Sequence, residues 1–252
     1  MLDRVGTVAA VGDEHRRRVA VACRILAAAG LIEDVLGHVS VRLDGDTVLV
    51  RSRGPDEAGV RYTESADIVA CSLAGVALED TDRTLPNELP IHLACYRDDP
   101  AVRAVVHAHP PAVIAADLAG VALVPLVGAY NIPAARLAAD GIPVFHRSVL
   151  INTDALATEM RAAMGDRPAC ILRGHGITTT GTTLEQAVAR ALAVDSLARM
   201  SMRVATAGGT PTAIPAADLA QLPDLGAGFN DEMLWRHHER RLADAVGGGG
   251  GS

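Results

Sequence analysis

Val105-Val106-His107-Ala108-His109-Pro110 is the segment around which the rest of this sequence is organised. The apolar residues 104–106 predict the end of a buried strand, and strand side chains alternate between two faces. His107 and His109 therefore project from the same face, with Cβ atoms about 6 to 7 Å apart. Two such imidazoles can bind one cation. Pro110 ends the strand, which places the pair at an edge or rim of a sheet, where functional sites are common.

Two satisfied polar residues on an ordinary strand are the alternative interpretation, and a His-x-His pair at a strand end favours the metal. A third ligand is predicted at His175, because residues 169–172 indicate another buried strand and Gly174 and Gly176 allow a close backbone approach. Glu88 is a fourth candidate, since it opens a helical run in which His92, four residues later, could share a face with it. Three imidazoles and a carboxylate suit a divalent transition metal in a catalytic site.

Length and composition exclude several classes of protein. A chain of 252 residues is long enough for one domain with a sizeable core, and its residues are 49% hydrophobic but only 2% aromatic. The core must therefore consist mainly of alanine, valine, leucine and isoleucine. The net charge of −7 argues against nucleic-acid and anionic-membrane partners. No apolar run is long enough to span a bilayer, so we expect no membrane anchor. We also expect no nucleic-acid partner and no membrane partner.

The cysteine pattern indicates a reducing compartment. Cys23, Cys71, Cys95 and Cys170 show no CxxC spacing, and most of them lie within apolar stretches. We expect buried free thiols in a cytoplasmic enzyme.

The chain divides into four predicted segments. Residues 1–13 carry little pattern and are expected to be loosely held, and residues 14–208 form the catalytic domain. Residues 209–246 make a proline-punctuated C-terminal segment with a helix, and residues 247–252 are a glycine-rich tail or linker. Residues 37–42 and 47–52 predict a hairpin. Short hairpin connections among interspersed strands and helices favour a mixed sheet between helices over a doubly wound parallel one.

Three motifs taken in order resemble the class II aldolase and adducin family, of the fuculose-phosphate aldolase-like type. They are Pro86-Asn87-Glu88 with His92, then His107-Ala108-His109-Pro110, then Arg173-Gly174-His175-Gly176. The resemblance extends from about residue 16 to about residue 205. Residues 37–42 are similar to the family's Gly-Asn-Val-Ser segment, and Arg53-Gly54 stands where the family has Thr-Gly.

The resemblance implies a three-layer α/β/α fold with a mixed, largely antiparallel central sheet. It further implies one divalent metal ion per subunit, zinc in the first place with iron or manganese as alternatives, and a homotetramer. C-terminal segments in this family reach a neighbouring subunit's active site, a role open here to Trp235, His237 or His238. A surface helix with two solvent-facing histidines is the alternative.

A divalent cation with open positions stabilises an enolate, which retro-aldol cleavage, decarboxylation and epimerisation have in common. Glu88 is predicted either to complete the metal shell or to transfer a proton, and the second role requires a raised pKa. Tyr130 is a candidate proton donor, with a core tyrosine whose hydroxyl is satisfied as the alternative.

Substrate-binding positions depart from the sugar-phosphate aldolase pattern. His38, Arg53-Gly54 and Asn87 occupy the places of the family's phosphate-binding residues. An arginine and a histidine fit a planar carboxylate better than a phosphate, because arginine binds a carboxylate through two parallel hydrogen bonds. In the alternative, Arg53 pairs with Asp56 or Glu57 within its own loop.

The metal ligands make a metal-dependent carbon–carbon lyase the first expectation. The resemblance implies which one, because the family includes dihydroxyphthalate-type decarboxylases, and adjacent hydroxyls of such an acid would bind the metal. An aldolase or epimerase acting on a sugar acid or sugar phosphate is the alternative. A non-haem iron oxygenase is a further variant. Retention of Glu88 and the three histidines disfavours a non-catalytic interaction protein like adducin.

Overall fold

A seven-stranded mixed sheet forms the centre of the computed structural model, which describes residues 2–128 and 130–247. The strand order is β3-β2-β1-β4-β7-β6-β5, and every neighbouring pair is antiparallel except β5 and β6. The strands are β1 (His38–Arg42), β2 (Thr47–Arg51), β3 (Ile68–Ser72), β4 (Ala104–Ala108), β5 (Val144–Phe145), β6 (Ala169–Leu172) and β7 (Gly176–Gly181). The predicted hairpin is confirmed by β1 and β2.

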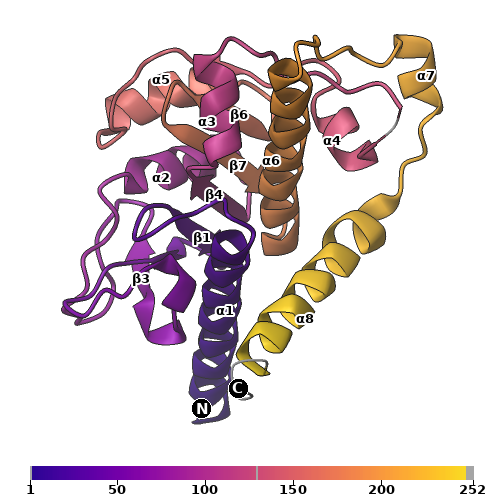
Figure 1. Ribbon diagram of the computed structural model, residues 1–252. Helices are drawn as coiled ribbons and strands as arrows, with labels where there is room; N and C mark the ends of the chain where they lie inside the picture. The colour runs from indigo at the N-terminus through magenta and orange to yellow at the C-terminus, as the bar shows by residue number, and fades with distance from the viewer. Residues whose placement is uncertain (1, 129, 248–252) are drawn as a thin grey trace.

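Helices cover both faces of the sheet, which confirms the three-layer α/β/α prediction (Figure 1). On one face α1, α3, α4, α6 and α8 pack together, and α2 and α5 pack on the other. Their bounds are α1 (Leu2–Ala28), α2 (Leu89–Asp98), α3 (Pro111–Leu118), α4 (Ile132–Leu137), α5 (Asp154–Met164), α6 (Leu184–Thr206), α7 (Ala216–Gln221) and α8 (Leu234–Gly247). Short helical turns η1 (Val60–Tyr62), η2 (Ser65–Asp67) and η3 (Gly228–Met233) complete the structure.

Small aliphatic side chains fill the core on both faces of the sheet. Along β4 the alternation is visible directly, because Ala104 and Val106 pack under α1 and α6 while Val105 packs under α2. All four cysteines are buried and free, as the sequence indicated. Within the described residues, none of the helices combines the length and the apolar composition needed to cross a bilayer.

Both ends of the chain are helical where they are described. Helix α1 begins at Leu2, earlier than the predicted start at residue 13 or 14. In the C-terminal segment, α8 packs against α1, and the guanidinium of Arg18 lies 5.7 Å from the ring centre of Trp235. Trp235 therefore contacts its own chain. The four segment boundaries stay predictions, and residues 248–252 of the glycine-rich tail lie outside the described residues.

Candidate metal centre

Three chain segments meet at one end of the central sheet and bring the four predicted ligands together. His107 and His109 come from the end of β4, His175 directly precedes β7, and Glu88 directly precedes α2. Because β4 and β7 are antiparallel neighbours with Ala108 opposite Ile177, the end of one strand lies beside the start of the other.

A glycine makes this close approach possible. A Cβ atom on Gly176 would lie 2.2 Å from the carbonyl oxygen of Ala108 and 3.1 Å from the Cα of His109. Gly174 has a φ of 61°, which an L side chain rarely adopts, and the amide of His175 donates to Leu172 across the turn. The Gly-His-Gly sequence therefore holds His175 tightly against the end of β4.

Nitrogen and oxygen atoms from the four residues lie within 4.8 Å of one another. The Nε2 atoms of His107 and His109 are 2.8 Å apart, and Oε2 of Glu88 lies 3.3 Å from Nε2 of His107 and 3.4 Å from Nε2 of His175. Such a spacing of donors suits a cation of ionic radius typical for first-row metals.

Hydrogen bonds to the main chain orient two of these side chains. Nδ1 of His107 lies 3.1 Å from the carbonyl oxygen of Ile177, which only accepts, so Nδ1 carries the proton and Nε2 presents its lone pair to the centre. Oε1 of Glu88 accepts from the amide of Ile151 at 2.9 Å, which turns Oε2 toward the histidines. Both arrangements are typical of metal ligands.

The electrostatics of the centre favour a cation. Burial alone would raise the pKa of Glu88, but the close approach of the His107 and His175 rings to Oε2 outweighs it and lowers the pKa below its ordinary value. Burial lowers the pKa of His109 to about 3, with His107 contributing. At neutral pH the site thus offers an ionised carboxylate and uncharged imidazole. A lowered pKa for Glu88 favours its role as a ligand over its role as an acid.

The three imidazoles and the carboxylate are chemically suited to a divalent ion. Nε2 of His107 has no proton, so its 2.8 Å contact with Nε2 of His109 requires either a proton on His109 or a cation between the rings. Three imidazole nitrogens and one carboxylate oxygen match the ligands of zinc, iron and manganese sites.

The loop that carries Arg53 lies at the same end of the sheet. Ser40 pairs with Val50 in the antiparallel hairpin, so the end of β2 lies beside the start of β1, and Arg53 follows soon after β2 ends. Arg53 also exchanges two backbone hydrogen bonds with Thr84, in the segment that leads to Asn87 and Glu88. The substrate-binding candidates on this loop therefore belong to one region with the metal ligands.

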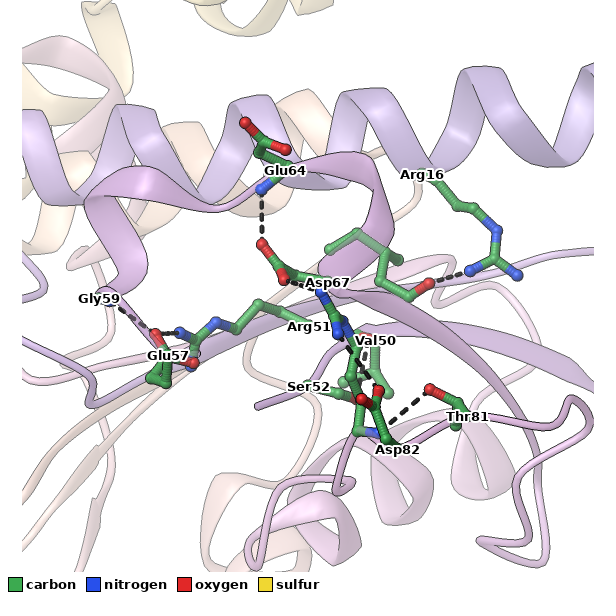
Figure 2. A network of polar contacts seen from close by, with 12 residues as sticks. Arg16, Val50, Arg51, Ser52, Glu57, Gly59, Glu64, Asp67, Thr81 and Asp82 are labelled. Atoms are coloured by element: carbon green, nitrogen blue, oxygen red, sulfur yellow. Dashed lines mark hydrogen bonds and ion pairs between the residues drawn. The ribbon is translucent and has the colours of Figure 1, made fainter. Parts of the chain in front are cut away.

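In the alternative interpretation Arg53 forms an ion pair within its own loop, and Figure 2 shows which residues contact Glu57 in that loop. Glu57 accepts from the guanidinium of Arg51 at 2.5 Å and from the amide of Gly59. The guanidinium of Arg53 instead donates to the carbonyl oxygen of Val35, and within the described residues no carboxylate lies within 4 Å of it. The predicted pairing of Arg53 with Asp56 or Glu57 is thus wrong, because Arg51 takes the carboxylate.

The other predicted site residues differ in their surroundings and in their exposure to solvent. The ring centre of His38 lies 5.0 Å from that of His107, and Asn87 is exposed immediately before Glu88. Gly54 lies against the side chain of Arg83. Tyr130 is 56% exposed and its hydroxyl lies 3.5 Å from Ser196, so it is neither a core tyrosine nor part of this chain's ligand cluster. Its role as a proton donor stays a prediction.

A buried polar network beside the centre escaped sequence reasoning. Glu88 is the N-cap residue of α2 and not part of the helix, and His92 contacts His38 and Ser40. A signal was present in the alternation of His38 and Ser40 along a strand, and in His92 and Tyr96 four residues apart on a helix.

Comparison with known proteins gives a consistent result. The model of the class II aldolase and adducin N-terminal domain matches residues 17–202. A 3,4-dihydroxyphthalate decarboxylase from Terrabacter sp. (strain DBF63) is 51% identical over 231 residues, which cover 90% of this chain and 97% of the relative. Another protein of that name, from Arthrobacter keyseri, is 48% identical over 91% of this chain and 94% of the relative.

Among solved structures, the L-fuculose 1-phosphate aldolase from Glaciozyma antarctica PI12 superposes with a TM-score of 0.76 at 21% identity. The match covers 94% of this chain and 93% of the aldolase. At this level of identity the similarity concerns the fold alone.

Replacing His107 with alanine is expected to remove the metal without unfolding the chain. His107 is fully buried at the centre and its Nε2 lone pair faces the other ligands, so its loss leaves too few donors. Elemental analysis should find close to one divalent ion per chain in the wild type and almost none in the variant. His146→Ala, at an exposed histidine outside the cluster, is the control and should retain the metal. Full metal content in His107→Ala would contradict the assignment.

Proposed function

Since the chain belongs to the class II aldolase and adducin family, we propose that it is a metal-dependent carboxy-lyase that releases CO2 from a dihydroxyaromatic acid of the dihydroxyphthalate type. The observation that carries this proposal is the 51% identity, over nearly the whole chain, with a 3,4-dihydroxyphthalate decarboxylase. The clustered imidazoles and carboxylate support it, because a non-catalytic relative has no need of them.

His107, His109, His175 and Glu88 would hold one divalent ion, and zinc is the ion we propose. When bound, such an ion attracts anionic substrate oxygens and stabilises the negative charge that develops beside the breaking bond. Glu88 is a ligand in this proposal, since both of its oxygens are already engaged, one by the amide of Ile151 and one by the histidines.

Decarboxylation breaks the bond between a ring carbon and the carboxylate carbon, and the electron pair stays on the ring carbon until a proton replaces CO2. The protein has to grip the acid so that the carboxylate lies at the reacting position. Arg53 is the group proposed to do this, because its guanidinium faces no carboxylate among the described residues and its backbone pairs with Thr84, in the segment that leads to Glu88. Gly54 keeps the loop compact against Arg83, and Asn87 supplies a further polar contact.

We place the active enzyme in a tetramer in the cytoplasm. The exposed position of Tyr130 fits a role at a neighbouring subunit's site better than at its own. His237 and His238 on α8 are proposed to lie near such a boundary. Four buried free thiols fit a reducing compartment.

A second candidate is an aldolase or epimerase acting on a sugar acid or sugar phosphate, which the fold similarity to a fuculose-phosphate aldolase favours. His38 and Arg53 count against the phosphorylated version, because they replace the small donors that phosphate binding uses in that family.

The first test of the proposed function is CO2 release by the zinc-loaded enzyme over a panel of hydroxylated aromatic acids. We expect 3,4-dihydroxyphthalate to be the best substrate, with monohydroxylated acids turned over far more slowly because they lack adjacent hydroxyls. Sugar acids and sugar phosphates assayed for aldehyde release serve as the comparison. Aldehyde release without any CO2 release from the aromatic acids would favour the aldolase and sink the decarboxylase.

Replacing Arg53 with lysine tests the carboxylate grip. Lysine keeps the charge but not the two parallel hydrogen bonds, and hydrogen bonds to charged groups are worth roughly 1.5 to 3 kcal/mol each. We expect kcat/KM to fall on the order of tenfold or more with unchanged metal content. Arg17→Lys, on an exposed ion pair of α1, should have no effect. A wild-type rate for Arg53→Lys would remove the argument for a carboxylate at this position.

Sedimentation tests the tetramer. The zinc-loaded protein at micromolar concentration should sediment as a species of four chains, because the family's active sites lie near subunit boundaries. A monomer under those conditions would contradict the proposed assembly.

A further inference from the structure

Four polar side chains form an unbroken hydrogen-bonded chain beneath the metal centre. Tyr96 lies 2.7 Å from Oγ of Ser40, Ser40 lies 2.6 Å from Nδ1 of His92, and Nε2 of His92 lies 2.7 Å from Nδ1 of His38. His38 and Ser40 share a face of β1, while His92 and Tyr96 share a face of α2. All four residues are buried, so water does not compete for these bonds.

The proton on Tyr96 sets the direction of the whole chain. Burial raises the pKa of Tyr96 above its ordinary value, so the hydroxyl keeps its proton. Among the described side chains, Ser40 is the partner of that hydroxyl, so Tyr96 donates to Ser40. Ser40 Oγ has one proton of its own, and since its other partner among the described residues is Nδ1 of His92, it donates the proton there.

The same donor-to-acceptor direction continues through the imidazoles of His92 and His38. Nδ1 of His92 accepts the hydrogen bond from Ser40, so this nitrogen carries no proton and the His92 ring is neutral. A neutral His92 that accepts at Nδ1 must carry its proton at Nε2, and it donates that proton to Nδ1 of His38. His38 is left with its own proton on Nε2.

The Nε2 edge of His38 is the one turned away from His92. The ring of His38 lies between the two neighbouring histidines, with centres 4.8 Å from His92 and 5.0 Å from His107. On the strand, His38 is directly opposite His107, so it stands at the same end of the sheet as the metal ligands. Yet it is not one of the four residues whose donor atoms cluster.

We infer that the Tyr96–Ser40–His92 chain holds His38 in its Nε2–H tautomer, which keeps it out of the metal shell and makes it a hydrogen-bond donor to a substrate oxygen. A protonated nitrogen has no lone pair for a metal, so the same proton that excludes His38 from the shell equips it to bind the substrate. His38 is thus a substrate-orienting residue, and His92, Ser40 and Tyr96 are positioning residues that act through it. This inference rests on the proposed function for the identity of the oxygen, a carboxylate or hydroxyl of the aromatic acid.

The tautomer can be measured without any activity. In zinc-loaded protein with ¹⁵N-labelled histidine side chains, nitrogen NMR distinguishes protonated, unprotonated and metal-bound ring nitrogens. The His38 signals are those that disappear in His38→Gln. We expect a protonated Nε2 and an unprotonated Nδ1. A proton on Nδ1, or a metal-bound Nε2, would overturn the inference.

Tyr96→Phe tests whether the chain is the cause. Without the phenolic proton, Ser40 can either donate to His92 or accept from it, so the second tautomer of His38 should appear in the spectrum. Tyr62→Phe, at an exposed tyrosine, is the matched control and should leave the spectrum unchanged. A Tyr96→Phe spectrum identical to that of the wild type would show that the chain does not set the tautomer.

Two replacements of His38 separate a donor from a ligand. His38→Gln retains an N–H group near the position of Nε2, whereas His38→Leu has none. We expect the leucine variant to lose on the order of tenfold or more in kcat/KM and the glutamine variant to retain most of it, with zinc affinity unchanged in both. Weaker zinc binding in both variants would identify His38 as a ligand and overturn the inference.

These outcomes are distinguishable from a failure of the proposed function. If no aromatic acid loses CO2 but His38 shows the Nε2–H tautomer and Tyr96→Phe disturbs it, the tautomer inference stands and the substrate assignment fails. If CO2 is released but the tautomer is the other one, the proposed function stands and this inference fails.

Discussion

The antiparallel contact between β4 and β7 is the constraint on which the rest of the site depends. At Gly176 the backbone of β7 comes so close to Ala108 that a Cβ atom would lie 2.2 Å from its carbonyl oxygen. This approach brings His175 beside His107 and His109 although about seventy residues separate them in the sequence. Because the sheet fixes the backbone at this point, three imidazoles are held in place before any ion arrives, which limits the entropic cost of binding one.

Hydrogen bonds around this contact also fix which ring nitrogen of His107 and of His38 carries the proton. The carbonyl of Ile177 fixes the proton of His107 on Nδ1 and frees Nε2 for a metal, whereas the buried chain from Tyr96 fixes the proton of His38 on Nε2. Two histidines that face each other across neighbouring strands therefore have opposite tautomers. For that reason the two rings have opposite tasks in the proposed site, His107 toward the ion and His38 toward the substrate.

Sequence patterns were sufficient to find the four residues that cluster, because each lies at an element boundary marked by glycine or proline. Strand alternation placed His107 and His109 on one face, and Gly174 and Gly176 marked His175. The pairing of Arg51 with Glu57 was not predictable, since two nearby arginines competed for one carboxylate and only the register of β2 decides between them. The Tyr96 chain was missed because it joins a strand face to a helix face, and periodicity says nothing about which faces meet.

X-ray absorption spectroscopy of the zinc-loaded protein tests most directly whether three imidazoles and one carboxylate form a single metal site where β4 ends and β7 begins. We expect nitrogen and oxygen atoms at about 2.0 to 2.2 Å from the zinc, with the multiple-scattering pattern of three imidazoles. Sulfur at about 2.3 Å would place the metal at a cysteine instead. Either that result or a shell with fewer than three imidazoles would contradict a metal site made by His107, His109, His175 and Glu88.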